Sequence, residues 1–527
     1  MKKRDFFHSA GMTVAIMIAA TLLSKALGLV RQMMMAAVFA ASVEGIAFSA
    51  ASRIPLAIFD MLFSTAILGS FLPIYKGGLE TDAARAKRFS SSFLSAILAV
   101  TAAVSLVGVL FSDGLIGMLA PELAPETKAL AALLLRIMFP SVIFAGAAYT
   151  LVGVLQSHER FLLPAIVSAV SNLIMIVYLA SRETPVDRGD AIGLAVAYLI
   201  SWMAQFFTLA VPLFRERKFP LLTRRLKNSD VALAFRRSLP VMFSSWLIPV
   251  TTLTAGAFSS LIASESIEAD AASGAAIVVY ENAFSVFSIA AGLIVYGVCN
   301  YIFPKLSARA AGADRSGFAE LMRGGLLISF SMILPLAVFL FLMSGEIVSL
   351  LYMRGDFTAG LARAAGESLR MLTLAMPAYA LWELFSRVCY SAGRVRLPML
   401  SSIVGIGAML AAFFGFWLTG TLNVSTVALA SAVGQIVSAL VLCIASFCIF
   451  SDGSQMVSFR KTALLLLGSS VSGLAMWGSK AILMQFLNFS NTFQNFIAIA
   501  IVFAVGFMVY LIWLIMTKII TASIFHP

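Results

Sequence analysis

The chain has 527 residues, of which 61% are hydrophobic and 12% are charged, and its formal net charge is +12 at pH 7. Soluble domains carry about 25% charged residues, so this composition excludes a soluble enzyme and predicts a chain that is solvated by lipid. The short alternating strands of a transmembrane β-barrel are missing, which leaves an all-α polytopic membrane protein.

Fourteen apolar segments of helical length follow one another along the chain. They centre roughly on residues 20, 58, 100, 145, 170, 202, 248, 285, 333, 380, 409, 437, 472 and 508, and segments of this kind cross the hydrocarbon core of a membrane. Lys and Arg gather in the loops on the side of the N-terminus. Because basic residues mark cytoplasmic loops, we expect both termini in the cytoplasm and the chain in the inner membrane. The positive charge is therefore topological, and no nucleic-acid partner is expected.

The first predicted helix carries a polar stripe within its apolar sequence. Ser24, Lys25, Gly28, Arg31 and Gln32 recur at spacings of three, four and seven residues, which place them on one side of a helix. A charged side chain at mid-bilayer costs about 2.5 to 3.5 kcal/mol, so this stripe should face protein or water. Either the basic residues bind an anion such as a pyrophosphate, or they reach the two membrane interfaces by snorkelling.

A second polar stripe is predicted in the next helix, where Ser49, Arg53, Asp60 and Ser64 align. Pro55 lies between the two charges, so we expect a kinked helix of the kind that forms a moving gate. In the functional interpretation, Arg53 adds to a cationic cavity wall that attracts an anion. In the structural alternative, Arg53 pairs with Asp60.

Two distant stretches of the chain repeat one another at an offset of 234 residues. The matched pairs are Arg136 and Arg370, Ser157 and Ser391, Arg160 and Arg394, and Pro164 and Pro398. Such repeats are typical of transporters built from duplicated bundles. We therefore predict a six-helix lobe over residues 1–217, a basic cytoplasmic linker over 218–237, a second six-helix lobe over 238–452, and two additional transmembrane helices over 453–527. Each repeat crosses an even number of times, so the lobes should be parallel, with a central cavity between them.

Polar residues also interrupt the eighth and tenth predicted helices. Glu281 and Asn282 in the eighth helix are candidates for gating or coupling. Glu383 and Arg387 stand four residues apart with the acid first, which favours a structural ion pair, although Glu383 is also a candidate for a protonatable group. The residues considered for gating or coupling are therefore Gly28, Pro55, Asp60, Glu281, Asn282, Glu383 and Arg387.

Enzymatic chemistry finds no support in the sequence. We identify no nucleophile with its base, no paired catalytic carboxylates and no metal-ligand spacing. No catalytic residue, metal site or cofactor is therefore expected. Transport could be coupled to an ion gradient or to the membrane potential.

Several motifs resemble one family of transporters. Ser-Lys-Ala-Leu-Gly-Leu-Val-Arg at residues 24–31 resembles the Ser-Arg-x-Leu-Gly-x-x-Arg-Asp signature of the MurJ/MviN lipid II flippases, a family of the MOP exporter superfamily. Residues 53–55 resemble its basic-apolar-Pro element, and residues 70–75 its closure of the second helix. In the second lobe, residues 351–358 and 387–390 are similar to its Gly-x-Phe loop and its Arg-x-Phe-Tyr element. The likeness covers about the first 400 residues and matches a plan of six, six and two helices.

The resemblance implies a pair of lobes that alternates between inward- and outward-open states. It would carry the headgroup of an undecaprenyl-pyrophosphate-linked precursor for peptidoglycan synthesis through a polar cavity. The polyprenyl tail would stay in lipid, along an apolar groove of the two additional helices. The implied headgroup-binding residues are Ser24, Lys25, Arg31, Gln32 and Arg53. The expected partners are this lipid-linked glycan and membrane lipids, and we expect a monomer.

This chain also departs from the family pattern. Lys25 and Gln32 stand where the signature has Arg and Asp, Phe59 and Asp60 replace basic residues, and the Arg expected after Asn282 is absent. Two rival transporters therefore stay open, an exporter of another polyprenyl-linked polysaccharide unit and a MATE-like multidrug/cation antiporter. A scaffold without transport activity is a third alternative. The deep charges of Lys25 and Arg53 argue against a cationic substrate.

Overall fold

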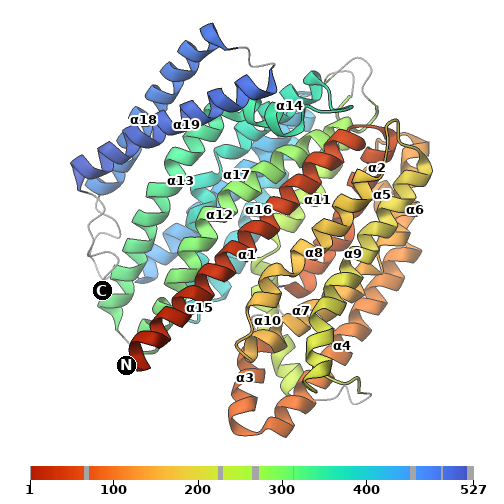
Figure 1. Ribbon diagram of the computed structural model, residues 1–527, viewed down its shortest axis with the longest axis vertical. Coiled ribbons are helices and arrows are strands. Elements are labelled where there is room, and N and C mark those ends of the chain that lie inside the picture. Colours follow the sequence, from red (N-terminus) through yellow and green to blue (C-terminus); the bar gives the residue numbers. More distant parts are fainter. Residues whose placement is uncertain are drawn as a thin grey trace. The chain divides into compact units, whose positions relative to one another are not determined.

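The computed structural model describes residues 2–64, 71–223, 229–263, 267, 272–312, 314–450, 459–487 and 491–518. Every regular element in these ranges is helical (Figure 1). Ser70 of the second motif, residues 224–228 of the predicted linker and residues 453–458 at the start of the predicted additional helices lie outside the described residues. The all-α class is therefore confirmed for the part of the chain that the structure describes.

The chain divides into two compact units. Unit 1 comprises Met1–Leu261 and Ala272–Val278, and unit 2 comprises Ile262–Ala271 and Val279–Pro527. The helices of unit 1 are α1 (Lys2–Val38), α2 (Val43–Phe59), the π-helical turn η1 (Asp60–Ser64), α3 (Leu72–Thr81), α4 (Ala83–Leu110), α5 (Ser112–Leu119), α6 (Pro125–Met138), α7 (Ser141–Ser157), α8 (Leu162–Ala180), α9 (Arg188–Arg215), α10 (Ser229–Ser244) and α11 (Leu247–Ser260).

Unit 2 contains most of α12, which begins in unit 1, and all of the helices that follow. They are α12 (Ala275–Ala311), α13 (Arg315–Tyr352), α14 (Ala359–Thr373), α15 (Met376–Ser391), α16 (Arg396–Leu418), α17 (Val424–Phe450), α18 (Phe459–Phe486) and α19 (Thr492–Thr517). The two additional helices, α18 and α19, lie side by side and both contact α13 (Figure 1).

Within the described ranges, 11 helices are long and apolar enough to cross a membrane, or 12 if the bent pair α10 and α11 forms one span. The predicted number of fourteen crossings is larger. One reason is that the crossing predicted near residue 380 corresponds to α14 and α15, with 15 and 16 residues, and each is shorter than the roughly 20 residues that a span needs. The exact number of crossings stays a prediction.

Helices α10 and α11 group with unit 1, and the lobe and linker bounds expected from the sequence stay a prediction. Side chains tie this part of the chain to η1 and α4. Asp230 accepts two hydrogen bonds from Arg85, and the indole of Trp246 donates to the carbonyl oxygen of Met61. These contacts lie between residues that are 145 and 185 positions apart, so the local pattern of the sequence does not reveal them.

The second helix changes its geometry after Pro55 instead of at it. Ser42 caps the start of α2 by accepting a hydrogen bond from the backbone N–H of Gly45 at 3.1 Å. The α-helix then continues through Pro55 to Phe59 and passes into η1 at Asp60. Short π-helical turns widen the backbone and often occur at functional sites.

Aromatic rings hold the short helix α3 against α4 in the core of unit 1. The ring centroid of Phe71 lies 5.2 Å from that of Tyr75, 5.4 Å from that of Phe89 and 5.0 Å from that of Phe93. All four side chains are almost fully buried. Offset ring contacts of this kind stabilise a core beyond their area of burial, and they fix one wall of a pocket described below.

Candidate functional site

The polar stripe of α1 meets α8 at two of its five positions. Ser24 is buried, and its hydroxyl donates to the carbonyl oxygen of Ala165 at 3.2 Å. Asn172 donates from its side-chain amide to the carbonyl oxygen of Ser24, also at 3.2 Å. A Cβ added at Gly28 would lie 3.4 Å from the same amide nitrogen. This face of α1 is therefore a seam between two helices, and Lys25 lies beside the seam, partly exposed.

Three elements of unit 1 bring charges together around Tyr198. This side chain of α9 is 9% exposed and lies within electrostatic range of both Arg31 of α1 and Asp60 of η1. Arg31 and Asp60 are themselves partly exposed, as is Gln32. The Asp60 carboxylate and the Arg31 guanidinium therefore both act electrostatically on the Tyr198 phenol. We identify this group of side chains, Arg31, Asp60 and Tyr198, as the Tyr198 cluster.

Arg53 lies where α2, α11 and the first turn of α12 meet. Its Nη2 donates to the carbonyl oxygen of Ile277 at 2.9 Å. On the side of α11, a Cβ added at Gly256 would lie 3.1 Å from Nη1. A carbonyl oxygen and the surface of Gly256 therefore orient the guanidinium. Gly256 belongs to no motif in the sequence, so it could not be selected in advance.

The polar candidates of the second lobe lie in unit 2. Arg387 forms the ion pair with Glu383 that their spacing indicates, and its Nη1 also donates to the carbonyl oxygen of Glu383 at 3.0 Å. The side chains are 18% and 10% exposed, so the pair is charge-compensated inside the unit. Asn282 is buried, and Glu281 lies within electrostatic range of Tyr352.

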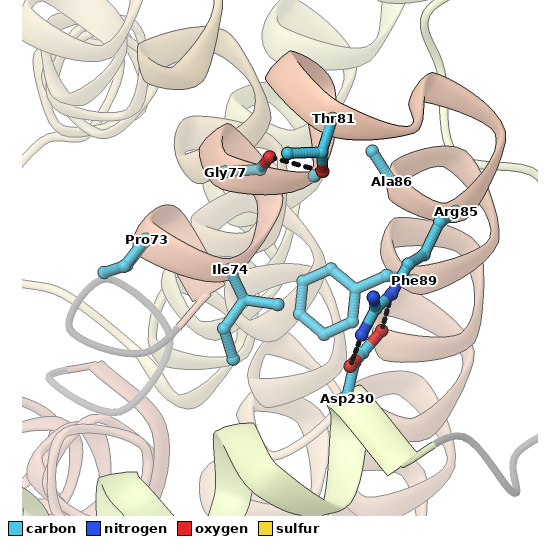
Figure 2. A pocket seen from close by; sticks show the side chains of 9 residues that line it. Pro73, Ile74, Gly77, Thr81, Arg85, Ala86, Phe89 and Asp230 are labelled. Atoms are coloured by element: carbon cyan, nitrogen blue, oxygen red, sulfur yellow. Dashed lines mark hydrogen bonds and ion pairs between the residues drawn. The ribbon is translucent and has the colours of Figure 1, made fainter.

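An open pocket of about 260 Å³ lies at the end of unit 1 where α3, α4 and α10 meet. Figure 2 shows the Arg85–Asp230 pair along one side, and Phe89 and Ile74 within the pocket. The hydroxyl of Thr81 donates to the carbonyl oxygen of Gly77 at 2.9 Å. The sequence shows only basic residues in this region, which indicate topology, so it does not predict the pocket.

Comparison with known proteins gives consistent results. A family model described as "Lipid II flippase MurJ" matches residues 35–503. The chain is 25% identical over 391 residues to the probable lipid II flippase MurJ of Buchnera aphidicola subsp. Schizaphis graminum, and the match covers 73% of each chain. It is also 25% identical over 391 residues to the lipid II flippase MurJ of Burkholderia cenocepacia, again with 73% of each chain covered.

Solved structures show the same fold. The chain matches a structure described as lipid II flippase MurJ in an inward closed conformation with a TM-score of 0.75 and 21% identity, over 96% of this chain and 99% of that one. An inward-facing MATE family multidrug transporter of the MOP superfamily matches with a TM-score of 0.66 and 13% identity. This match covers 83% of this chain and 98% of that one. These two transporter types therefore share the architecture described above.

Proposed function

Because the chain belongs to the lipid II flippase MurJ family, whose model matches residues 35–503, we propose that it moves lipid II from the inner to the outer leaflet by alternating access. The match to the family model carries this proposal, since the fold alone is shared with multidrug transporters. The protein would thereby supply peptidoglycan synthesis with its precursor. The substrate is a lipid-linked glycan, and membrane lipids surround the protein, which acts as a monomer in the inner membrane with both termini in the cytoplasm.

The basic residues of unit 1 provide the chemistry for the pyrophosphate. Arg31 and Arg53 each present a planar guanidinium that matches phosphate oxygens, and Lys25 adds a partly exposed ammonium group. Charge-assisted hydrogen bonds from such groups are roughly twice as strong as neutral ones. Gln32 would hydrogen-bond the headgroup. Ser24 would act through the α1–α8 seam, because its hydroxyl donates to Ala165.

Gating and coupling are assigned to the remaining polar candidates. Gly28 allows α1 to lie close to Asn172, and Pro55 precedes the turn that carries Asp60. In unit 2, Glu281, Asn282, Glu383 and Arg387 would respond to the transport cycle. No cofactor is needed in this scheme, and an ion gradient or the membrane potential would drive it.

One observation favours a second candidate function, the export of a cationic compound. The fold matches MATE transporters, and Asp60 supplies a carboxylate close to Tyr198. Deep basic residues oppose a cationic substrate, however, and they suit a diphosphate. Export of another polyprenyl-linked polysaccharide unit would use the same diphosphate chemistry and differ only in the glycan.

The proposal is tested by depletion of the resident lipid II flippase in a bacterial host that expresses this chain. Growth and the exposure of lipid II on the outer leaflet are followed together. Restored exposure supports lipid II as the substrate. Unchanged lipid II exposure, despite confirmed membrane expression, would favour another lipid-linked glycan or a cationic compound.

A further inference from the structure

Two helices of unit 1 break at neighbouring positions in space. The first break is η1, where α2 gives way to a π-helical turn over Asp60–Ser64. The second lies between α10 and α11, whose axes are bent by 50° across a break of two residues. Helix breaks are the places at which a backbone changes direction most readily.

Trp246 connects these two breaks. It is the residue immediately before α11, and its indole Nε1–H donates to the carbonyl oxygen of Met61, the second residue of η1, at 2.9 Å. An indole N–H inside a protein normally needs an acceptor. The Met61 carbonyl supplies that acceptor. The bond therefore links the residue before α11 directly to η1.

The remaining contacts of this segment reinforce the connection. The ring of Trp246 packs on Phe243, with centroids 4.5 Å apart, so the indole is held from the end of α10. The other end of α10 is tied to α4 by the Arg85–Asp230 pair. Helix α10 is thus fixed to unit 1 at both ends, and the bond to Met61 is the tie at the end next to the bend.

We propose that Trp246 is a positioning residue for the Tyr198 cluster and that it couples η1 to the bend between α10 and α11. The bond fixes the Met61 carbonyl, and Asp60 is the residue directly before it. A change in the bend would therefore be passed to the Asp60 carboxylate, which lies within electrostatic range of Tyr198. The consequence for transport rests on the proposed function, but the coupling of the two breaks does not.

The test compares hydrogen exchange in purified full-length protein in lipid nanodiscs for the natural chain, Trp246→Phe and Trp513→Phe. Phenylalanine keeps a ring at position 246 but removes the donor. Trp513 is a matched control, because its Nε1 donates to the carbonyl oxygen of Leu464 at 2.8 Å in unit 2. The peptides that cover residues 60–64 and 244–247 are followed in each protein.

We expect Trp246→Phe to accelerate exchange in both peptides together, by roughly fivefold, as the loss of one hydrogen bond implies. Trp513→Phe should leave both peptides unchanged. Acceleration of one peptide alone, or of neither, would overturn the proposal. If the phenylalanine variant is poorly folded, benzothienylalanine at position 246 gives the same test, since it has the shape of tryptophan without the N–H.

Transport is measured separately as lipid II exposure in cells. If the two breaks are coupled, Trp246→Phe should lower the exposure of lipid II on the outer leaflet severalfold at equal expression. Trp513→Phe should leave it unchanged. If the natural chain moves no lipid II, the proposed function is wrong, and the exchange data still decide whether the two breaks are coupled.

Discussion

Arg85 and Asp230 join α4 to the start of α10 through two parallel hydrogen bonds. Nε of Arg85 lies 2.9 Å from Oδ2 of Asp230, and Nη2 lies 2.7 Å from Oδ1. The Asp230 side chain is 12% exposed and that of Arg85 is 61% exposed. This bidentate pair holds the start of α10 against α4 within unit 1.

The contribution of this pair to stability should depend on both hydrogen bonds and not on charge alone. Arg85→Lys keeps the charge but cannot form both bonds, so it should lower the thermal midpoint by roughly 1 to 3 °C. Asp230→Asn should have a similar effect, and the double variant should be no worse than either single variant. Lys87→Gln, at an exposed position of the same helix, is the control. Additive losses in the double variant would show that the two side chains act independently.

Gly256 should control the position of Arg53. A Cβ at this residue would lie 3.1 Å from Nη1, so Gly256→Ala requires the guanidinium to move by a few tenths of an ångström, and Gly256→Val requires a larger shift. We expect lipid II exposure to fall a few fold for alanine and further for valine, at unchanged membrane expression. Gly407→Ala is the matched control, since nothing lies within 4 Å of the added atom. Equal activity of all three variants would contradict the role given to Arg53.

A buried ion pair attaches the additional helices to α13. Lys480 of α18 lies 2.7 Å from Glu346, with both side chains 17% exposed, and Asn495 of α19 donates to the carbonyl oxygen of Glu346 at 3.0 Å. Lys480→Met leaves a partly buried carboxylate without its cation, which should cost about 1 to 3 kcal/mol of stability. The double variant with Glu346→Gln should recover part of this loss. Unfolding midpoints in nanodiscs would show whether it does.

His158 predicts a dependence of stability on pH. Burial, followed by the nearby positive charge of Lys218, lowers the pKa of this imidazole below its ordinary value. A lowered pKa in the folded state means that protons bind better to the unfolded chain. The contribution of His158 to the free energy of unfolding should therefore be constant above about pH 6.5. The free energy of unfolding should fall as the pH drops below that value. His158→Gln should lose less stability between pH 7 and pH 5 than the natural chain, and an equal loss would refute the assignment.

Local features of the site could be predicted from the sequence. The Glu383–Arg387 pair spans four residues of one helix, so its spacing was enough to indicate the contact. The motifs at residues 24–31 and 53–55 were likewise enough to suggest the family, which the comparison with known proteins confirms. The α-helical class followed from the composition together with the helix-length apolar segments.

Contacts between distant segments could not be predicted in this way. The spacing of Ser24 and Gly28 defined a face of α1 but not its neighbour, which is Asn172 of α8. Arg53 and Trp246 both donate to backbone carbonyls, and a carbonyl carries no signature of residue type. For the same reason the contacts of α10 with α4 and of Trp246 with η1 could not be predicted from the sequence.

The most direct test of the central claim is a flipping assay with the purified chain in proteoliposomes that contain fluorescent lipid II. We predict that lipid II in the inner leaflet becomes accessible from outside at a rate well above that of empty liposomes, and that Arg53→Gln lowers this rate. A folded, reconstituted protein whose liposomes expose lipid II no faster than empty ones would contradict the claim that this chain is a lipid II flippase.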